Sequence, residues 1–407
     1  MRVEIEPSLA KGTVSAPTSK SIAHRMLIAA ALAEGKSELY GIRECQDVSA
    51  TVDCLRALGA KIEIDKKSGT YTVYGVDITN AAPTSKLFAN ESGSTLRFLI
   101  PIASLTGKSV EFCGAKRLME RPLSVYEKIY ADSGYTFRRE GNSLTVEGKI
   151  PSGEYVIPGD ISSQFITGLI FALPLAGKSS TIKIIPPFES RSYVEMTLAA
   201  VREFGIHAKF LDQFTIGIES GRYRPRSLSV EGDYSGSAFI EALNLFGGEV
   251  TVKGLLPCSL QGDRVYREHF LSLNRGFAKI DISDCPDLGP ILFAVAVAKF
   301  GGEFIGTARL KIKESDRASA MKEELSKLGA LVEVYDDKVI IKKQELKSPS
   351  VPISSHNDHR IVMSMAVLLT LVGGCIEGAS AIDKSYPDFF RHLQMLGIKV
   401  KIENEAE

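Results

Sequence analysis

The sequence predicts a mixed α/β protein of two domains, each built from three repeats of one α/β unit. Two recurring elements in the 407 residues support this prediction. One is a helix that ends at or near a glycine and is followed by short alternating strands. The other is a polar helix start that leads into an apolar helix. At 44% hydrophobic and 24% charged residues, the composition is that of an ordinary globular protein with a sizeable core.

The glycine-terminated helices set the length of the repeat. A glycine at this place is a typical helix C-cap in the left-handed conformation. The strands that follow alternate polar and apolar residues, as in Ala60–Ile64 and Ala330–Val334. The glycines are separated by 75, 71, 71, 53 and 68 residues, which predicts six units. They are Gly59, Gly134, Gly205, Gly276, Gly329 and Gly397.

The helices with polar starts have bodies that are apolar nearly all round, which is typical of helices buried in a core. A helix start presents free backbone N–H groups and a positive dipole end, so it attracts anions. If these helices run side by side, their starts converge on one anion-binding surface. The polar residues could be N-caps only, but N-caps do not require the lysines and arginines found beside them. The starts are Lys20-Ser21, Glu91–Arg97, Ile161–Gln164, Asp233–Ser237, Asp284–Asp287 and Asn357–Arg360.

Charge and cysteine usage exclude several classes of protein. Lys and Arg number 49, as do Asp and Glu, which argues against a nucleic-acid or anionic-membrane partner. Six cysteines without a CxxC pair, and a strand-like N-terminus without a signal segment, predict a cytoplasmic protein with reduced thiols. The apolar stretch Ile361–Gly374 is too short to span a membrane. Gly221–Arg226 is the expected mid-chain linker, and Pro7–Thr13 is a second candidate crossing.

Candidate chemistry lies in clusters of basic residues at helix starts. Lys20, Ser21 and Arg25 open the first helix, and Arg117 lies in the basic loop Gly114–Pro122. Three further clusters are Lys313–Arg317, Asp358–Arg360 and Lys384–Pro387. Taken singly, each also fits a solvated or capped helix start.

No GxGxxG, P-loop, HExxH or serine-elbow motif is present. Chemistry would therefore need Lys/Arg clamps on anions and a carboxylate pair for proton transfer, for which Asp287 and Glu314 are the best candidates. No metal is expected, because His356 and His359 have no third ligand nearby.

Taken in order, the motifs resemble the 5-enolpyruvylshikimate-3-phosphate synthase family over nearly the whole chain. The resemblance implies a two-domain inside-out α/β barrel with six βαβαββ repeats, three per domain. Domain one would comprise residues 1–12 and 229–407, domain two residues 13–228, with the active site in the cleft between them. The matching motifs are Pro17–Arg25, Ser92–Arg97, Arg117–Pro122, Ser162–Phe165, Ser190–Tyr193, Asp284–Pro290, Lys313–Arg317, Asp358–Arg360 and Lys384–Phe390.

The resemblance also implies the reaction: the enolpyruvyl group of phosphoenolpyruvate moves to the 5-hydroxyl of shikimate 3-phosphate, releasing phosphate. Asp287 would be the base at the hydroxyl, Glu314 the acid toward the methylene, and Lys20 a third catalytic group. No cofactor is implied, and a monomer is expected. Phosphoenolpyruvate would be held by Lys20, Arg117, Arg317, Arg360 and Lys384, beside Gly93 and Gln164. Shikimate 3-phosphate would be held by Ser21, Arg25, Ser162, Ser163, Gln164, Ser190, Asp287 and Lys313, with Tyr193 against its ring.

Three positions depart from the commonest family pattern: Glu91 and Arg309 where asparagine is frequent, and Ser94 where threonine is. Two other functions stay open. The related enolpyruvyl transferase acting on UDP-N-acetylglucosamine carries a cysteine five residues before the Arg-Pro of its loop, where this chain has Lys116. A non-catalytic anion-binding repeat protein would have no need of Asp287 or Glu314.

Overall fold

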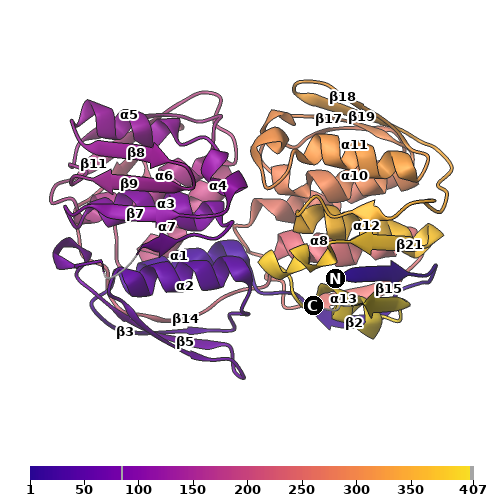
Figure 1. Ribbon diagram of the computed structural model, residues 1–407, viewed down its shortest axis with the longest axis horizontal. Helices are drawn as coiled ribbons and strands as arrows, with labels where there is room; N and C mark the ends of the chain where they lie inside the picture. The colour runs from indigo at the N-terminus through magenta and orange to yellow at the C-terminus, as the bar shows by residue number, and fades with distance from the viewer. Residues whose placement is uncertain (84–85, 404–407) are drawn as a thin grey trace. The chain divides into compact units, whose positions relative to one another are not determined.

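The computed structural model describes residues 1–83 and 86–403 (Figure 1). The chain forms two compact units, and each is described by itself. Unit 1 comprises Met1–Pro17 and Gly232–Glu407, and unit 2 comprises Thr18–Glu231. The chain therefore leaves unit 1 after its first strands and returns to it in its second half.

Six sheets form in the described residues, three in each unit, so the prediction of six repeated sheet–helix units is confirmed. In the complete pattern, two strands pair in parallel, and a hairpin then adds two antiparallel strands. The sheet formed by residues 87–147 in unit 2 shows it: the order is β6-β7-β9-β8, with β6 parallel to β7 and β9 antiparallel to both of its neighbours. Its elements are β6 (Leu87–Phe88), α3 (Gly93–Ser104), β7 (Val110–Cys113), α4 (Lys116–Glu120), α5 (Ser124–Asp132), β8 (Thr136–Glu140) and β9 (Ser143–Glu147).

Two further sheets repeat this order from contiguous segments. One lies in unit 2, and its strands and helices are β10 (Glu154–Pro158), α6 (Ser163–Ala172), β11 (Ser180–Ile185), α7 (Arg191–Glu203), β12 (Ala208–Phe210) and β13 (Thr215–Ile218). The other lies in unit 1, and its strands and helices are β16 (Ala278–Asp281), α10 (Gly289–Ala298), β17 (Gly302–Ile305), α11 (Arg317–Lys327), β18 (Leu331–Val334) and β19 (Lys338–Lys342).

Two sheets are completed by strands from distant parts of the chain. In unit 2, β14 (Ser227–Ser229) pairs in parallel with β3. In unit 1, β1 (Arg2–Ile5) lies between β21 and β22 and is antiparallel to both, so the indigo strand in Figure 1 lies beside a yellow one. The other elements are α1 (Lys20–Ala31), β3 (Gly35–Tyr40), α2 (Gln46–Ala57), β4 (Lys61–Asp65), β5 (Thr70–Gly75), β20 (Ile353–Ser354), α12 (His359–Val372), β21 (Gly374–Glu377), α13 (Phe389–Met395) and β22 (Val400–Glu403).

The remaining unit is reduced, which the repeat pattern did not predict. Its sheet contains only β2 (Lys11–Ser15) and β15 (Glu249–Lys253), which pair in parallel. Its helices are α8 (Tyr234–Glu241), before β15, and α9 (Tyr266–Arg275), after it. We expected a strand–turn–strand after Gly276, but β16 begins the next sheet there. Gly276 has an extended backbone with φ 169°, whereas the other five repeat glycines have φ between 68° and 107°. The missing hairpin accounts for the short spacing of 53 residues between Gly276 and Gly329.

The apolar helices are buried, as their sequences predict. In unit 1, α10 is fully buried from Ile291 to Val297, and α12 is buried from His359 to Thr370. In unit 2, α3 and α6 pack against each other, and Phe98, Phe165 and Phe171 have almost no exposed surface. Two side chains at helix ends are exceptions: Phe300 lies beyond the end of α10 at Ala298 and is 43% exposed, and Leu371 near the end of α12 is 36% exposed.

The expected linker Gly221–Arg226 is wrong. It lies inside unit 2, where Tyr223 is buried and its hydroxyl donates to the carbonyl of Phe171 at 2.9 Å. No helix in the described part of the chain is long and apolar enough to cross a membrane.

Candidate active site

Side-chain caps hold most of the polar helix starts. Ser92 accepts from the Thr95 amide, Ser162 from Gln164, Asp233 from Gly236 and Asp358 from Arg360. The first helix differs: its N-cap is Ser19, which makes no side-chain cap bond, and the Thr18 hydroxyl donates instead to the Gly41 carbonyl. These caps fix where each helix begins, and so where its positive end lies.

Backbone strain gathers at the same helix starts. Four non-glycine residues of the described chain have positive φ: Asn90, Ser190, His356 and Asn357. Asn90 precedes the cap of α3, Ser190 caps α7, and the other two precede the cap of α12. Left-handed backbone at such residues costs free energy and is found mostly where function fixes the geometry.

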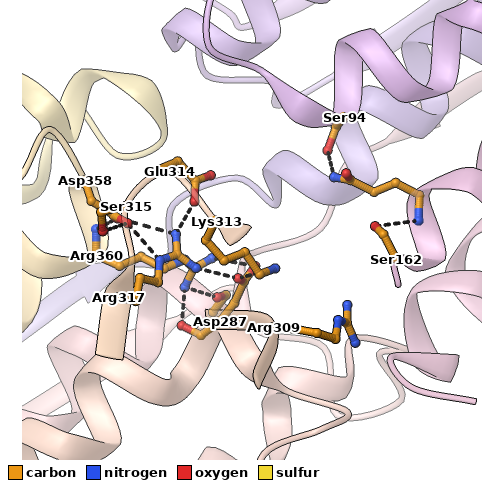
Figure 2. A network of polar contacts seen from close by, with 12 residues as sticks. Ser94, Ser162, Asp287, Arg309, Lys313, Glu314, Ser315, Arg317, Asp358 and Arg360 are labelled. Carbon is orange, nitrogen blue, oxygen red and sulfur yellow. Dashed lines mark hydrogen bonds and ion pairs between the residues drawn. The ribbon is translucent and has the colours of Figure 1, made fainter. Parts of the chain in front are cut away.

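In unit 1, the Arg317 guanidinium lies among three carboxylates (Figure 2). It donates to Asp358 at 2.8 Å, to Asp287 at 2.8 Å and to Glu314 at 2.6 Å. The Arg317 side chain is 1% exposed, and Asp358 is fully buried. Arg317 therefore links α11, the start of α12 and the turn before α10 in one buried charged network.

Asp287 is the second centre of this network. Its carboxylate also contacts Lys313 Nζ at 3.1 Å and Arg360 Nη2 at 3.2 Å. Burial alone would raise the pKa of Asp287, but Arg360, Lys313 and Arg317 together hold it well below its ordinary value. Burial lowers the pKa of Lys313 to about 8, although Asp287 opposes the shift. Asp287 is therefore a carboxylate at neutral pH, and Lys313 is a cation close to its titration point.

Further groups extend the network. Arg360 donates to the Ser235 hydroxyl at 2.7 Å and to the Asp287 carbonyl at 2.8 Å. Burial, and to a smaller extent the nearby charge of Asp287, raise the pKa of Asp263 to about 6. Lys384 is buried, and its ammonium donates to the backbone carbonyl of Asn357. Six site residues expected from the sequence thus lie in unit 1. Five of them form a single network, Asp287, Lys313, Glu314, Arg317 and Arg360, and the sixth is Lys384.

In unit 2, Lys20 opens α1 and forms an ion pair of 2.7 Å with Asp47, at the start of α2. His24, one turn later, is buried and contacts the Thr51 hydroxyl at 2.7 Å. Burial, then Lys20 and Arg25, lower the pKa of His24 well below its ordinary value. His24 is therefore neutral, and Lys20 is the cationic group at this helix start.

Gln164, at the start of α6, joins the starts of α3 and α6. It accepts from Arg97 at 2.7 Å and donates to the Ser94 hydroxyl at 3.0 Å. A side chain at Gly93 would place its Cβ 2.7 Å from the Arg121 guanidinium and 3.1 Å from that of Arg97. Gly93 thus leaves room for two buried guanidinium groups at a helix start.

Arg25 connects α1 to α7. It donates to Thr197 at 2.9 Å, to the Tyr193 carbonyl at 3.0 Å and to the Ser21 carbonyl at 2.7 Å, and burial lowers its pKa to about 10. Ser190 is buried, Tyr193 is half-buried, and Ser163 is buried at the start of α6. Arg117 is exposed on the short helix α4. The unit 2 candidates thus lie at the starts of α1, α3, α6 and α7, with Arg117 outside this set.

Several residues of these networks were not among the expected site residues. They are Asp47, Arg97, Arg121, Ser235, Asp263 and Asp358. Arg97, Arg121 and Asp358 stand in motifs that the sequence does single out, and only their burial was missing. Asp47 and Ser235 carry no local signal beyond an ordinary helix start.

In the described residues, one group has the donor types of a metal site: Glu323, Glu324 and His356. The Lys327 ammonium already contacts both Glu324 oxygens, at 2.7 and 3.0 Å. A cation would have to displace this ammonium, so the group fits an ion pair better than a metal site.

Comparisons with known proteins agree on one family. The profile of EPSP synthase (3-phosphoshikimate 1-carboxyvinyltransferase) matches residues 6–393. The 3-phosphoshikimate 1-carboxyvinyltransferase of Clostridium kluyveri is 38% identical over 97% of each chain, and that of Clostridium perfringens is 37% identical over 97% of this chain and 98% of its own. A solved EPSP synthase structure from Acinetobacter baumannii superposes with a TM-score of 0.78 at 23% identity, covering 99% of this chain and all of its own.

Proposed function

The chain belongs to the EPSP synthase family, and from this premise we propose that its charged networks carry that family's reaction. The enzyme transfers the enolpyruvyl group of phosphoenolpyruvate to the 5-hydroxyl of shikimate 3-phosphate and releases phosphate, a step of the shikimate pathway to aromatic amino acids. One observation carries the assignment of residues: Lys313, Arg317 and Arg360 all contact the Asp287 carboxylate. Glu314 forms an ion pair with Arg317 in the same network.

Two carboxylates divide the proton transfers in this proposal. Asp287 accepts the proton of the 5-hydroxyl as its oxygen bonds to the central carbon of phosphoenolpyruvate. Glu314, which takes up a proton when substrate binds, donates it to the methylene carbon, which becomes the methyl group of a tetrahedral intermediate. Glu314, now deprotonated, takes a methyl proton back as phosphate leaves, which restores the double bond. The depressed pKa of Asp287 keeps this carboxylate ionised at neutral pH, as a proton acceptor must be, but it also makes Asp287 a weak base before substrate binds.

The cations bind and orient the anionic substrates. Both substrates carry a phosphate and a carboxylate, and charge-assisted bonds from Lys and Arg are the strongest donors for such groups. We assign phosphoenolpyruvate to Lys20, Arg117, Arg317, Arg360 and Lys384, beside Gly93 and Gln164. We assign shikimate 3-phosphate to Ser21, Arg25, Ser162, Ser163, Gln164, Ser190, Tyr193, Asp287 and Lys313.

Residues of both units therefore act on the same pair of substrates. The functional division we propose places residues 1–12 and 229–407 in one domain and 13–228 in the other. We also propose that the protein is a monomer and that it works in the cytoplasm; the six free thiols support the second point only. Gel filtration and fractionation of cells test these two points.

The assay is phosphate release with phosphoenolpyruvate and either shikimate 3-phosphate or UDP-N-acetylglucosamine. We expect release only with the first pair. Asp287→Asn and Glu314→Gln should each lower kcat by at least about 100-fold, the order expected for a general acid or base. Glu333→Gln, which alters an exposed ion pair with Lys342, is the matched control. Turnover of the nucleotide sugar alone, or wild-type rates in both variants, would overturn the assignment.

A further inference from the structure

Glu324 is a buried carboxylate that the proposed chemistry does not use. It lies two turns after Arg317 on α11, and its side chain is fully buried. Oε2 accepts from the Ser354 amide at 3.0 Å, and Oε1 contacts His356 Nε2 at 2.7 Å. Lys327 bonds to both oxygens and to the Pro352 carbonyl at 3.1 Å. Since every contact lies on its own helix or on residues 352–356, Glu324 ties α11 to the segment that precedes α12.

That segment is held in a strained conformation. His356 and Asn357 have φ of 47° and 52°, two consecutive left-handed residues that are not glycine. Left-handed backbone at such residues costs free energy, so the conformation persists only where its surroundings impose it. Ser354 and Ser355 support it locally, because their hydroxyls accept from the amides of His356 and Asn357 at 3.3 and 3.2 Å. The imidazole bond to Glu324 is the contact that anchors the strained turn to α11.

The strained turn and the residue after it contact two buried cations, Lys384 and Arg317. The Asn357 carbonyl accepts from the Lys384 ammonium, and Asp358 accepts from Arg317 at 2.8 Å and from Ser315 at 3.0 Å. Arg317 and Glu324 therefore contact the same short segment from one helix face, at its two ends. A change in the backbone at residues 356–357 would therefore displace the Asn357 carbonyl, which orients Lys384, without requiring a change in the core of unit 1.

We propose that Glu324 and His356 are positioning residues for phosphoenolpyruvate, acting through the Asn357 carbonyl on Lys384. The inference rests on the proposed function, because it assumes that Lys384 binds this substrate. Neither residue touches substrate. The turn contacts Lys384 through Asn357 and leads into Asp358, which holds Arg317, and both cations are assigned to phosphoenolpyruvate. The Michaelis constant for phosphoenolpyruvate should therefore respond more than that for shikimate 3-phosphate.

The test measures both Michaelis constants, kcat and the urea unfolding of His356→Asn and Glu324→Gln. Asparagine tolerates left-handed backbone but lacks the imidazole, and glutamine keeps the shape of Glu324 without its charge. We expect KM for phosphoenolpyruvate to rise about fivefold or more in each, as for a loosened binding group, and KM for shikimate 3-phosphate to stay within about twofold. Glu323→Gln is the control, since this neighbour is 62% exposed and lies 3.9 Å from His356.

A double-mutant cycle with Lys384→Ala separates positioning from general stability. If His356 acts through Lys384, His356→Asn should change KM for phosphoenolpyruvate little once Lys384 is absent. Equal effects in both backgrounds, or equal rises in both Michaelis constants, would overturn the inference. A wild-type enzyme that does not turn over this substrate pair would instead overturn the proposed function. His356 is 23% exposed whereas Glu324 is fully buried, so His356→Asn is the less disruptive change. It is the deciding variant if Glu324→Gln does not fold.

Discussion

At the scale of single residues, Arg317 is the cation on which unit 1 depends most. Its guanidinium faces three carboxylates: Asp358 is fully buried, and Asp287 and Glu314 are only 21% and 19% exposed. Arg317→Lys keeps the charge but cannot donate in three directions from one planar group. We expect a loss of about 1–3 kcal/mol in the free energy of unfolding, the range for leaving a buried acceptor without its donor.

Urea unfolding measures this loss, and Arg267→Lys is the matched control. Arg267 makes a two-bond contact with Glu241, but its side chain is 51% exposed, so the same substitution should cost at most about 1 kcal/mol. Equal losses in the two variants would show that burial of the Arg317 network contributes nothing.

Lys313 gives the reaction a pH dependence. Burial lowers its pKa to about 8, so the folded protein destabilises the ammonium form; this cost is present below pH 8 and disappears as the pH rises toward the ordinary value of lysine. Activity has the opposite sign, because the ammonium binds an anion. We expect kcat/KM for shikimate 3-phosphate to fall above about pH 8.

In Lys313→Arg the guanidinium stays charged, so the alkaline limb of the pH–rate profile should move to higher pH or vanish. Lys311→Arg is the control, since Lys311 is 41% exposed and pairs with Asp336 at the surface. An alkaline limb at the same pH in Lys313→Arg would assign it to another group.

The sequence allowed the charged side chains to be predicted better than their partners. Lys313, Arg317 and Arg360 stand in recognisable motifs, and the structure brings them to Asp287. Asp47, Ser235 and Asp263 stand at ordinary helix starts, and only tertiary packing places them beside Lys20 and Arg360. Local propensity carries no information about such contacts, because the partners lie 27 to 125 positions apart in the chain.

At the scale of helices and strands, two aspartate caps on neighbouring helices should differ in importance. Asp316 caps α11 by accepting from the Ser319 amide at 3.1 Å and is partly exposed. Asp358 caps α12, is fully buried, and also holds Arg317. Asp316→Ala should cost about 1 kcal/mol of unfolding free energy with kcat unchanged, as for a simple cap.

Asp358→Ala should cost several times more, since it leaves a buried guanidinium with one partner fewer. Urea unfolding and kcat of both variants check this difference. If the two losses were equal, Asp358 would be a cap and nothing more.

Repeat elements could be predicted from the sequence because helix ends and strands leave local patterns. Five of the six repeat glycines are left-handed, as expected, and the apolar helices are buried. Gly276 shows where this reasoning ends: the residues around it resemble the other helix ends, yet no hairpin follows. The spacing of 53 residues to Gly329 carried that information, but strand pairing, which decides it, is a non-local property.

At the scale of the whole molecule, the path of the chain makes the two units unequal. Unit 2 is one continuous segment that contains all strands of its three sheets, including β14. Unit 1 needs residues 1–17, because β1 lies between β21 and β22 and β2 is the partner of β15. A chain that begins at residue 232 therefore has one sheet divided in two and one strand without its partner.

This difference predicts how fragments of the chain behave. Thr18–Glu231, expressed alone, should unfold cooperatively in urea, because its sheets and core are complete. Residues 232–407 should not, since removing β1 leaves both β21 and β22 with an open edge. Joining residues 1–17 to this fragment through a flexible linker should restore a cooperative transition, visible by circular dichroism. Cooperative unfolding of residues 232–407 without the first two strands would contradict the argument, since their pairing would then be dispensable to the fold of unit 1.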